Sequence, residues 1–350
     1  MPMIRAASRV HVRKISGGLL ISAGTAVFSG VVGLVVDAAV NGTVYRWVPM
    51  VVLFAVGLVL SGYGTWLLTH VPVSGGIVIA AIDDKGDPSY YQNAITSYMQ
   101  YSATHFTHAT SSQSRVHDPK DFNRLRDYVV TGLNSLAPGA DRPMRVGVYF
   151  QGAHHVGFYV GSLLISGGKR FDLYHSGADD GYFLAHRLDL PEKSTPTPPA
   201  EVHITVFLAE NGKFATGKQM AAAELRTYLA DAGRTGTIAL AANLVDPGEN
   251  EGFSGQVQDS ALEQGATALV LVGRPAAPER LPESLAAFES HTAAIIGVAR
   301  AIRAERGLLY LKTPAVVAVA LGRALRDGVW VPMQYLKPPT SRYAPFELDE

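Results

Sequence analysis

One short turn in this chain combines a cation, a hydroxyl and a helix start in a way that suits phosphate binding. Lys312, Thr313 and Pro314 follow the apolar run "GLLYL" and precede "AVVAVALGRAL". Proline suits the first helical turn and threonine is a favoured N-cap, so the spacing predicts a helix that opens near Pro314. The free amides of a helix N-terminus bind anions. We therefore expect Lys312 and this helix start to meet a phosphate.

A similar turn, "QGAHH", follows the apolar run "RVGVYF" earlier in the chain. It offers the amide of Gln151, the backbone of Gly152 and the imidazole of His154, which can hydrogen-bond a base or a phosphate. Adjacent histidines do not share a helix face, and no H-E-x-x-H pattern occurs, so we predict no metal site and no cofactor.

The chain lacks the usual signatures of an enzyme. It has no G-x-S-x-G elbow, no G-x-G-x-x-G after a strand, no phosphate loop of the G-x-x-x-x-G-K-[ST] type and no cysteine. The acid pairs in "IDDKGD" and "GADDG" could hold magnesium, but turns rich in Asp and Gly favour a surface role. We predict that the chain is not an enzyme. A nucleotide-processing enzyme (ring nuclease or hydrolase) and a ligand-free membrane scaffold remain alternatives.

Charge is distributed unevenly along the 350 residues. The formal net charge is zero, yet five bases and a single acid precede Gly75, which leaves 25 bases and 29 acids after it. Duplex DNA and RNA are bound through many cationic contacts to phosphates. We therefore expect no nucleic-acid duplex as a partner, although a few local groups can still bind a small phosphate ligand.

Two long uncharged runs near the start predict a pair of membrane spans. Ile15–Val36 and Trp47–Thr69 each exceed the roughly 20 apolar residues that cross a bilayer. Four bases lie in residues 1–14, so the positive-inside rule places that terminus, and the body that follows the hairpin of residues 15–70, in the cytoplasm. We expect a multi-pass membrane protein with both termini cytoplasmic.

Small residues recur every four positions in both runs, a pattern that lets helix backbones approach closely. Two interpretations stay open, namely packing within the hairpin and contact between protomers. The residues are Gly18, Ser22, Ala26 and Gly30 in the first run and Gly57, Ser61 and Thr65 in the second.

After Ser74, short apolar runs alternate with helical patterns, which predicts an α/β fold with a parallel sheet. The expected strands are Gly76–Ile82, Arg145–Phe150, Phe171–His175, Val202–Leu208, Gly236–Ala242, Ala266–Gly273, Gly307–Leu311 and Trp330–Leu336. The expected helices are Tyr90–Gln100, Lys120–Leu136, Lys218–Ala232, Pro282–Phe288 and His291–Glu305.

The body contains an internal repeat. "VYFQGAHHVGFYVGSLL" aligns with "LYLKTPAVVAVALGRAL" at a constant offset of 161 residues, which pairs Tyr149 with Tyr310 and Gly161 with Gly322. The starts also match, since "IVIAAIDDKG" is similar to "ITVFLAENGK". We predict two related α/β units, 75–190 and 202–350, joined by the Pro-rich linker 191–201 and facing each other across a pseudo-two-fold axis.

The twice-occurring pattern of strand, turn, helix, strand and Tyr with a final Leu-Asp resembles a SAVED domain, most clearly in "TPAVVAVALGRAL…VPMQYL…YAPFELD". SAVED domains fuse two Rossmann-like, CARF-like units. With the preceding hairpin, the chain resembles a transmembrane SAVED effector of a CBASS antiphage system. The resemblance implies a cyclic di- or trinucleotide ligand from a partner nucleotidyltransferase. It further implies homo-oligomerisation on binding and disruption of the bacterial inner membrane, so the lipid bilayer is a second partner.

Ligands of open α/β sheets bind at the carboxyl ends of the strands, so we expect the ligand-binding residues there. Tyrosine at such an edge can stack on a base, and Arg274 is a further base at a strand end. The expected ligand-binding set is Asp84, Lys85, Gln151, Gly152, His154, His175, Asn211, Lys213, Lys312, Thr313, Pro314 and Tyr335.

Overall fold

The structure is a computed structural model of the chain. It describes residues 18–32, 35, 47–69, 74–81, 104–109, 119–135, 144–165, 169–177, 181–188, 198–245, 250–274, 281–326, 328–336 and 342–347. The chain forms two compact units: the hairpin unit (Met1–Ser74 with Thr96–Ala103) and the body (Gly75–Ile95 with Thr104–Glu350). The predicted helix Tyr90–Gln100 lies outside the described residues.

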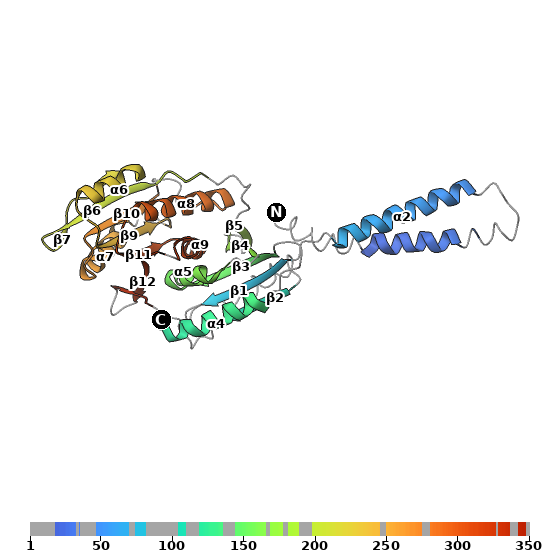
Figure 1. The fold of residues 1–350 in the computed structure, drawn as a ribbon, viewed down its shortest axis with the longest axis horizontal. Helices are drawn as coiled ribbons and strands as arrows, with labels where there is room; N and C mark the ends of the chain where they lie inside the picture. Colours follow the sequence, from blue (N-terminus) through green and yellow to red (C-terminus); the bar gives the residue numbers. More distant parts are fainter. Residues whose placement is uncertain are drawn as a thin grey trace. The chain divides into compact units, whose positions relative to one another are not determined.

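In the described part of the hairpin unit, a helix over residues 18–32 lies beside α2 (Trp47–Thr69) (Figure 1), and the two pack closely at glycine. A side chain at Gly24 would overlap Ser61 and lie 2.9 Å from the carbonyl oxygen of Gly57. Phe28 and Phe54 meet edge-on, with 4.9 Å between ring centroids. Among the helices whose side chains are described, none is long and apolar enough to cross a membrane.

The small residues of the hairpin unit fall on two different faces. Gly57 and Ser61 contact the first helix at Gly24, so packing within the hairpin accounts for them. The small residues at both ends of the row on the first helix are exposed, and a side chain added at either of these two glycines would meet no atom within 4 Å. That row, which we call the small-residue face, comprises Gly18, Ser22, Ala26 and Gly30.

The first sheet of the body has the strand order β2-β1-β3-β4-β5. Strand β1 pairs in parallel with β2, β3 pairs in parallel with β4, and β5 runs antiparallel to β4. The strands are β1 (Ser74–Ala81), β2 (Thr104–Ala109), β3 (Met144–Gly152), β4 (Lys169–Ser176) and β5 (Tyr182–Leu188). Among the described residues, the helices of this half are α4 (Pro119–Ser135) and α5 (His154–Leu163).

The second sheet has the order β13-β12-β11-β9-β10-β6-β7, with β8 also paired to β6. Its strands are β6 (His203–Glu210), β7 (Lys213–Phe214), β8 (Lys218–Met220), β9 (Thr237–Asn243), β10 (Ala268–Gly273), β11 (Arg306–Lys312), β12 (Trp330–Leu336) and β13 (Arg342–Pro345). Its helices are α6 (Ala222–Asp231), α7 (Asn250–Glu263), α8 (Leu285–Ala301) and α9 (Ala315–Leu325). The α/β fold predicted from the sequence is confirmed, but the sheets are mixed and not parallel as predicted, because β5, β6 and β13 run antiparallel to their neighbours.

The repeat extends to the whole strand order of each half. The order β2-β1-β3-β4-β5 recurs as β10-β9-β11-β12-β13, and in both halves the last strand is antiparallel to its neighbour. Tyrosines confirm the offset of 161, because Tyr149 packs on Tyr174 and Tyr182 just as Tyr310 packs on Tyr343. The two halves are therefore related at the offset of 161 residues that the alignment around the two central helices predicts.

The proposed match between the two starts is wrong. The counterpart of β1 is β9, because each lies next to the strand that precedes the central helix of its half. β6 instead runs antiparallel to β10, near the edge of the sheet. "ITVFLAENGK" resembled β1 because both are apolar strands followed by an acidic turn. The strands β6, β7 and β8 and helix α6 are thus an addition that precedes the second repeat.

Two helix predictions are also corrected. The run predicted as one helix from Lys218 begins with strand β8, and α6 starts only at Ala222. The two helices predicted over residues 282–305 are a single helix, α8, which Ser284 caps by accepting a hydrogen bond from the amide of Ala287 at 3.2 Å. Ser290, between the two predicted helices, lies within α8, where its hydroxyl donates to the carbonyl of Ala287 at 3.1 Å.

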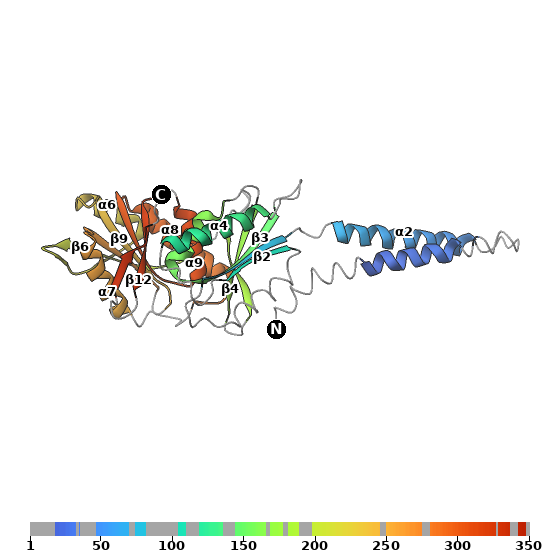
Figure 2. The ribbon, with the colours of Figure 1, turned by 90° about the horizontal axis from the view of Figure 1, so that it is seen from below.

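Helices α5 and α9 cross in the core of the body, and α9 lies between the two sheets in both views (Figure 1, Figure 2). A side chain at Gly161 would overlap the carbonyl of Val319, and one at Gly322 would overlap the carbonyl of Phe158. Phe158 and Val319 are themselves 161 residues apart, so the two contacts are reciprocal. A side chain at Gly157 would lie 3.4 Å from the methyl group of its own counterpart, Ala318. The pseudo-two-fold axis therefore passes through this crossing.

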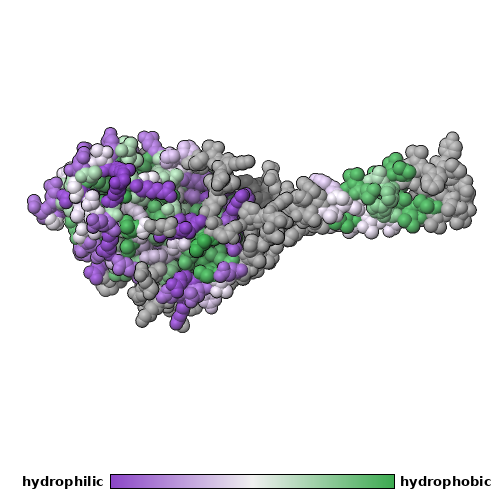
Figure 3. Space-filling model, viewed as in Figure 1, coloured by the Kyte–Doolittle hydropathy of each residue, from purple (hydrophilic) through white to green (hydrophobic). Residues whose placement is uncertain are grey.

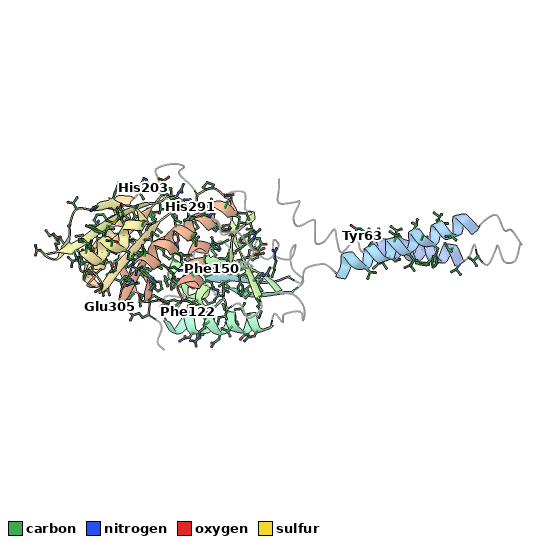
Figure 4. The ribbon with its side chains drawn as sticks, turned by 45° about the horizontal axis from the view of Figure 1, so that its top comes forward. Tyr63, Phe122, Phe150, His203, His291 and Glu305 are labelled. Atoms are coloured by element: carbon green, nitrogen blue, oxygen red, sulfur yellow. The ribbon has the colours of Figure 1, made fainter. Side chains whose placement is uncertain are left out.

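The core that surrounds the crossing joins both halves into one unit. Phe150 from β3 and Phe122 from α4 are buried in it (Figure 4), together with residues of α9 and β11. A second cluster covers the other face of the second sheet, where Phe253 and Val257 of α7 pack on Tyr310. The contact between the halves is thus continuous apolar packing.

Candidate functional site

The two predicted turns meet across the pseudo-two-fold axis. Nε2 of His154, the first residue of α5, lies 2.5 Å from the carbonyl oxygen of Thr313, just before α9. One turn further along, a side chain at Gly157 would lie 3.4 Å from the carbonyl oxygen of Ala315. The N-termini of α5 and α9 therefore lie next to each other, although they are far apart in the sequence.

Both helix starts keep their first-turn amides free of side-chain caps. The N-caps are Ala153 and Pro314, and among the described residues neither position supplies a capping side-chain hydrogen bond. Thr313 was predicted to cap α9, which is wrong: its hydroxyl donates to the carbonyl of Pro314 at 3.3 Å, and the residue is 2% exposed. Uncapped amides at two adjacent N-termini favour binding of anions.

Burial fixes the protonation state of His154. Desolvation lowers the pKa of its imidazole, and the hydrogen bond to Thr313 opposes this only partly. The ring is therefore neutral at pH 7. Because a carbonyl oxygen only accepts, Nε2 must carry the proton and donate it, which leaves Nδ1 as an acceptor.

The second turn is held from its own sheet as well. The amide of Leu244, after β9, donates to the carbonyl of Lys312 at 2.9 Å. The carbonyl of Leu244 in turn accepts from Nη1 of Arg274, after β10, at 3.1 Å. Arg274 is 6% exposed, and burial lowers the pKa of its guanidinium, which still stays protonated at neutral pH. Two cations, Lys312 and Arg274, thus lie at the carboxyl edge of this sheet.

Three other predicted residues also lie at carboxyl ends of strands. Gln151 is next to the last residue of β3, and its Oε1 is buried without a hydrogen-bond partner among the described residues. Gly152 ends that strand. Tyr335, near the end of β12, is 38% exposed, and its ring centroid lies 5.2 Å from that of Tyr343. The ring of Tyr335 can take part in stacking, whereas Tyr343 is buried.

His175 lies near the end of β4 but packs into an aromatic cluster. Its ring is 5.9 Å from that of Phe183 and 5.4 Å from that of Phe288 on α8. Burial lowers its pKa, and the carboxylate of Glu283 only partly counters this. A ligand role for His175 stays a prediction, and the described contacts give it a packing role between the halves.

The structure does not bring Asn211 and Lys213 to the paired turns. They belong to the hairpin between β6 and β7, where Asn211 has φ 51° and Gly212 has φ 74°, as a tight two-residue turn requires. Since β6 is antiparallel to β10, its end lies at the amino edge of β9, β10 and β11, opposite Lys312. The expectation that the ends of β6 and β11 share an edge was therefore wrong. Asp84 and Lys85 lie outside the described residues.

The sequence gives a weak indication that Arg274 lies at the site, but none that His154 contacts Thr313. Arg274 could be found because it directly follows the strand "ATALVLVG". The contact joins residues 159 positions apart and depends on the helix crossing. Nothing in the local pattern of either turn indicates it.

Three partly buried histidines, whose rings are desolvated, predict that the body loses stability in mild acid. Desolvation lowers the pKa of His154, His175 and His186 below the ordinary value of about 6.5. The unfolded chain then binds more protons than the folded one as the pH falls below that value. The unfolding free energy should be flat above about pH 6.5 and fall below it, by at most about 1.4 kcal/mol per pH unit for each histidine.

Urea denaturation of the purified chain at several pH values measures this slope. Each His→Gln replacement should remove up to one proton from the difference in bound protons between the unfolded and folded chain, and so lower the slope. An unchanged slope in all three variants would contradict the lowered pKa values of these histidines. Asp172 acts in the opposite direction, because burial raises the pKa of its carboxyl. Its contribution grows as the pH falls toward the ordinary aspartate range.

Comparison with known proteins finds similarity in structure but none in sequence. No protein-family model and no curated protein matches the chain. Two similar solved structures are of the Cap4 SAVED/CARF-domain containing receptor of Acinetobacter baumannii, with the cyclic trinucleotides 2'3'3'-cAAA and 3'3'3'-cAAA. Their TM-scores are 0.42 and 0.43, at 12% identity, covering 85% of this chain and 55% of theirs.

The Cap4 SAVED/CARF-domain containing receptor of Moraxella osloensis is also similar, with a TM-score of 0.41 and 11% identity over 83% of this chain and 53% of that one. This chain thus spans about half the length of the receptors that it resembles. The similarity is distant, and it identifies neither a family nor a ligand for this chain.

Proposed function

We propose that the chain is a membrane-anchored effector of a bacterial antiphage system whose body, a SAVED domain, binds a cyclic di- or trinucleotide. A partner nucleotidyltransferase supplies the ligand. Binding drives homo-oligomerisation, and the hairpin unit then disrupts the inner membrane. The chain acts as a receptor and does not process its ligand.

The observation that carries this proposal is the meeting of two uncapped helix N-termini at the contact between His154 and Thr313. A linear cation-rich groove would suit a nucleic-acid strand. Here a compact pair of anion-binding helix starts, with Lys312 and Arg274 beside them, suits a small ligand with several phosphates. Gln151 and Tyr335 add a polar amide and an exposed ring, the groups that recognise bases.

Exposed apolar side chains support the membrane role of the hairpin unit. Leu19, Val51 and Val59 are 64%, 63% and 69% exposed, and Figure 3 shows hydrophobic residues on its surface. The hydroxyls of Thr25 and Thr65 bond to carbonyls four residues earlier in their own helices, which satisfies them without water. These side chains belong to the two uncharged runs of the sequence, Ile15–Val36 and Trp47–Thr69. We place the chain in the bacterial inner membrane, with both termini in the cytoplasm.

The small-residue face supports the proposed oligomerisation. Both of its terminal glycines lie away from the contact within the hairpin unit, and in a bilayer such a face allows helices of neighbouring protomers to pack closely. Lengthening Ala26 to isoleucine should therefore weaken the oligomer, measured by analytical ultracentrifugation in detergent, without affecting ligand binding.

Binding of a cyclic-nucleotide panel to the purified full-length chain tests the proposal. We expect one cyclic di- or trinucleotide to bind and to be recovered intact. The Lys312→Glu variant should lose at least about 100-fold in affinity, because a charge-assisted contact to phosphate becomes a repulsion. The matched control is Lys169→Glu, which reverses a lysine at the amino end of β4 and should change affinity by less than about threefold.

Isothermal titration calorimetry gives both affinities. The absence of binding across the panel would refute the receptor proposal. Equal losses in the two variants would show that the chain attracts the ligand by net charge alone. Hydrolysis of the bound nucleotide would favour the alternative of a nucleotide-processing enzyme.

A further inference from the structure

The hydrogen bond between His154 and Thr313 has no counterpart at the equivalent positions of the two halves. At the offset of 161 residues the counterpart of His154 is Ala315, whose methyl group cannot return the hydrogen bond to the first half. The two turns are otherwise alike, since each joins the third strand in the order of its half to the central helix. The imidazole of His154 therefore makes a hydrogen bond between the halves that their pseudo-symmetry does not repeat.

Hydrogen bonds from two directions hold the Lys312–Thr313 turn. On one side, the Lys312 carbonyl accepts from the amide of Leu244, whose own carbonyl accepts from Arg274. On the other side, the next carbonyl in the chain, that of Thr313, accepts from His154. A continuous series of hydrogen bonds thus runs from the end of β10, through the ends of β9 and β11, to the start of α5.

The helix crossing itself lies away from the two turns. Contacts at Gly161 and Gly322 hold the helices together about two turns beyond their starts, and Gly157 packs against Ala315 about one turn from them. The bond from His154 to Thr313 joins the first residue of α5 directly to the turn before α9, so it is the contact that fixes the separation of the two starts.

We propose that His154 is a positioning residue: its hydrogen bond to Thr313 holds the two helix N-termini at the separation that a ligand bridging both turns requires. This inference rests on the proposed function for its consequence in binding. Its structural part, that the bond orders both turns, holds without any ligand. The two parts are therefore tested by separate measurements on the same variants.

Three variants of the full-length chain isolate the bond. His154→Leu removes it and leaves the Thr313 carbonyl without this partner. His154→Gln keeps an N–H donor on a flexible side chain. His291→Leu is the matched control, because Nδ1 of His291 also lies near a backbone carbonyl, that of Ala287 at 2.7 Å, but within α8 alone (Figure 4).

Hydrogen exchange without ligand measures the order of the turns. The informative amides are those of Leu244, Gly157 and Val317, which bond to the carbonyls of Lys312, Ala153 and Pro314. We expect exchange at these amides to rise about tenfold in His154→Leu and to stay near the original rate in the other two variants. Unchanged exchange in His154→Leu would overturn the inference, as would failure of His154→Gln to restore it.

Binding of 2'3'3'-cAAA, 3'3'3'-cAAA and a cyclic dinucleotide panel measures the consequence. Where a probe binds the original chain, His154→Leu should weaken it by about tenfold or more, with His154→Gln close to the original and His291→Leu unchanged. Faster exchange with unaltered affinity would overturn the positioning role. If no probe binds the original chain, the receptor proposal fails, and the positioning role fails with it even if exchange shows that the bond orders both turns.

Discussion

Replacing Gly322 by alanine should destabilise the body by about 3 kcal/mol or more, the largest effect that we expect from a single methyl group. The added carbon would overlap the backbone carbonyl of Phe158 on α5. Backbone cannot rotate away as a flexible side chain does, so α5 and α9 would have to separate. That separation would open the buried core around Val160 and Leu321.

The reciprocal change at Gly161 should have an effect of similar size, because its added carbon would overlap the carbonyl of Val319. Gly297→Ala is the matched control. Gly297 is also in a helix, α8, but no atom lies within 4 Å of its added carbon. That change should stabilise the body by up to about 1 kcal/mol, through the better helix propensity of alanine.

Urea denaturation followed by circular dichroism measures all three free energies of unfolding. Equal small effects at Gly322 and Gly297 would show that the helices do not cross as closely as described. A large effect at Gly322 alone would argue against the reciprocal pseudo-two-fold contact.

Charging the hairpin unit should abolish membrane damage while leaving ligand binding intact. Val59 is 69% exposed and lies near the middle of α2. An arginine at the centre of a membrane-inserted helix costs about 2.5–3.5 kcal/mol, enough to shift the helix out of the bilayer. The matched control is Val130→Arg, which charges an exposed valine on α4 of the body, 40% exposed.

Dye release from vesicles of phosphatidylethanolamine and phosphatidylglycerol, with the nucleotide that binds best, reads out the damage. We expect release by the original chain and by Val130→Arg, and none by Val59→Arg. Removal of residues 1–70 should likewise abolish release and spare binding, since the body has a core of its own. Toxicity in cells that persists after this deletion would refute the membrane role.

Much of the fold could be predicted because its central strands are buried on both faces. "GLLYL" and "GTIALAA" are continuous apolar runs, so β11 and β9 were found within two residues of their ends. β2, "THFTHA", was missed because its polar residues hide the strand pattern. α7 was missed because Gly252 and Gly255 suggest a loop, although Phe253, Val257 and Ala261 have helical spacing.

The candidate site could be located from the sequence only within each half. A proline after a strand marks the start of α9, and the repeat transfers that position to the turn that holds His154. Which turns meet is decided by the crossing of α5 and α9, a tertiary feature that no local pattern encodes. Strand direction is also a tertiary feature, and Asn211 was therefore predicted at the wrong edge of the second sheet. Its strand, β6, has the composition of a buried strand but runs antiparallel to β10.

The one-sided pair of His154 and Ala315 bears on the shape of ligand that two fused repeats can recognise. In a homodimer of identical subunits, every group on one side of the axis is repeated on the other, so a cavity on the axis has the symmetry of the dimer. Fusion into one chain lifts that requirement, and the two sides can then diverge. A ring of three nucleotides cannot be divided into two equal sets of whole nucleotides, and a cavity with unlike walls can hold such a ring in a single orientation.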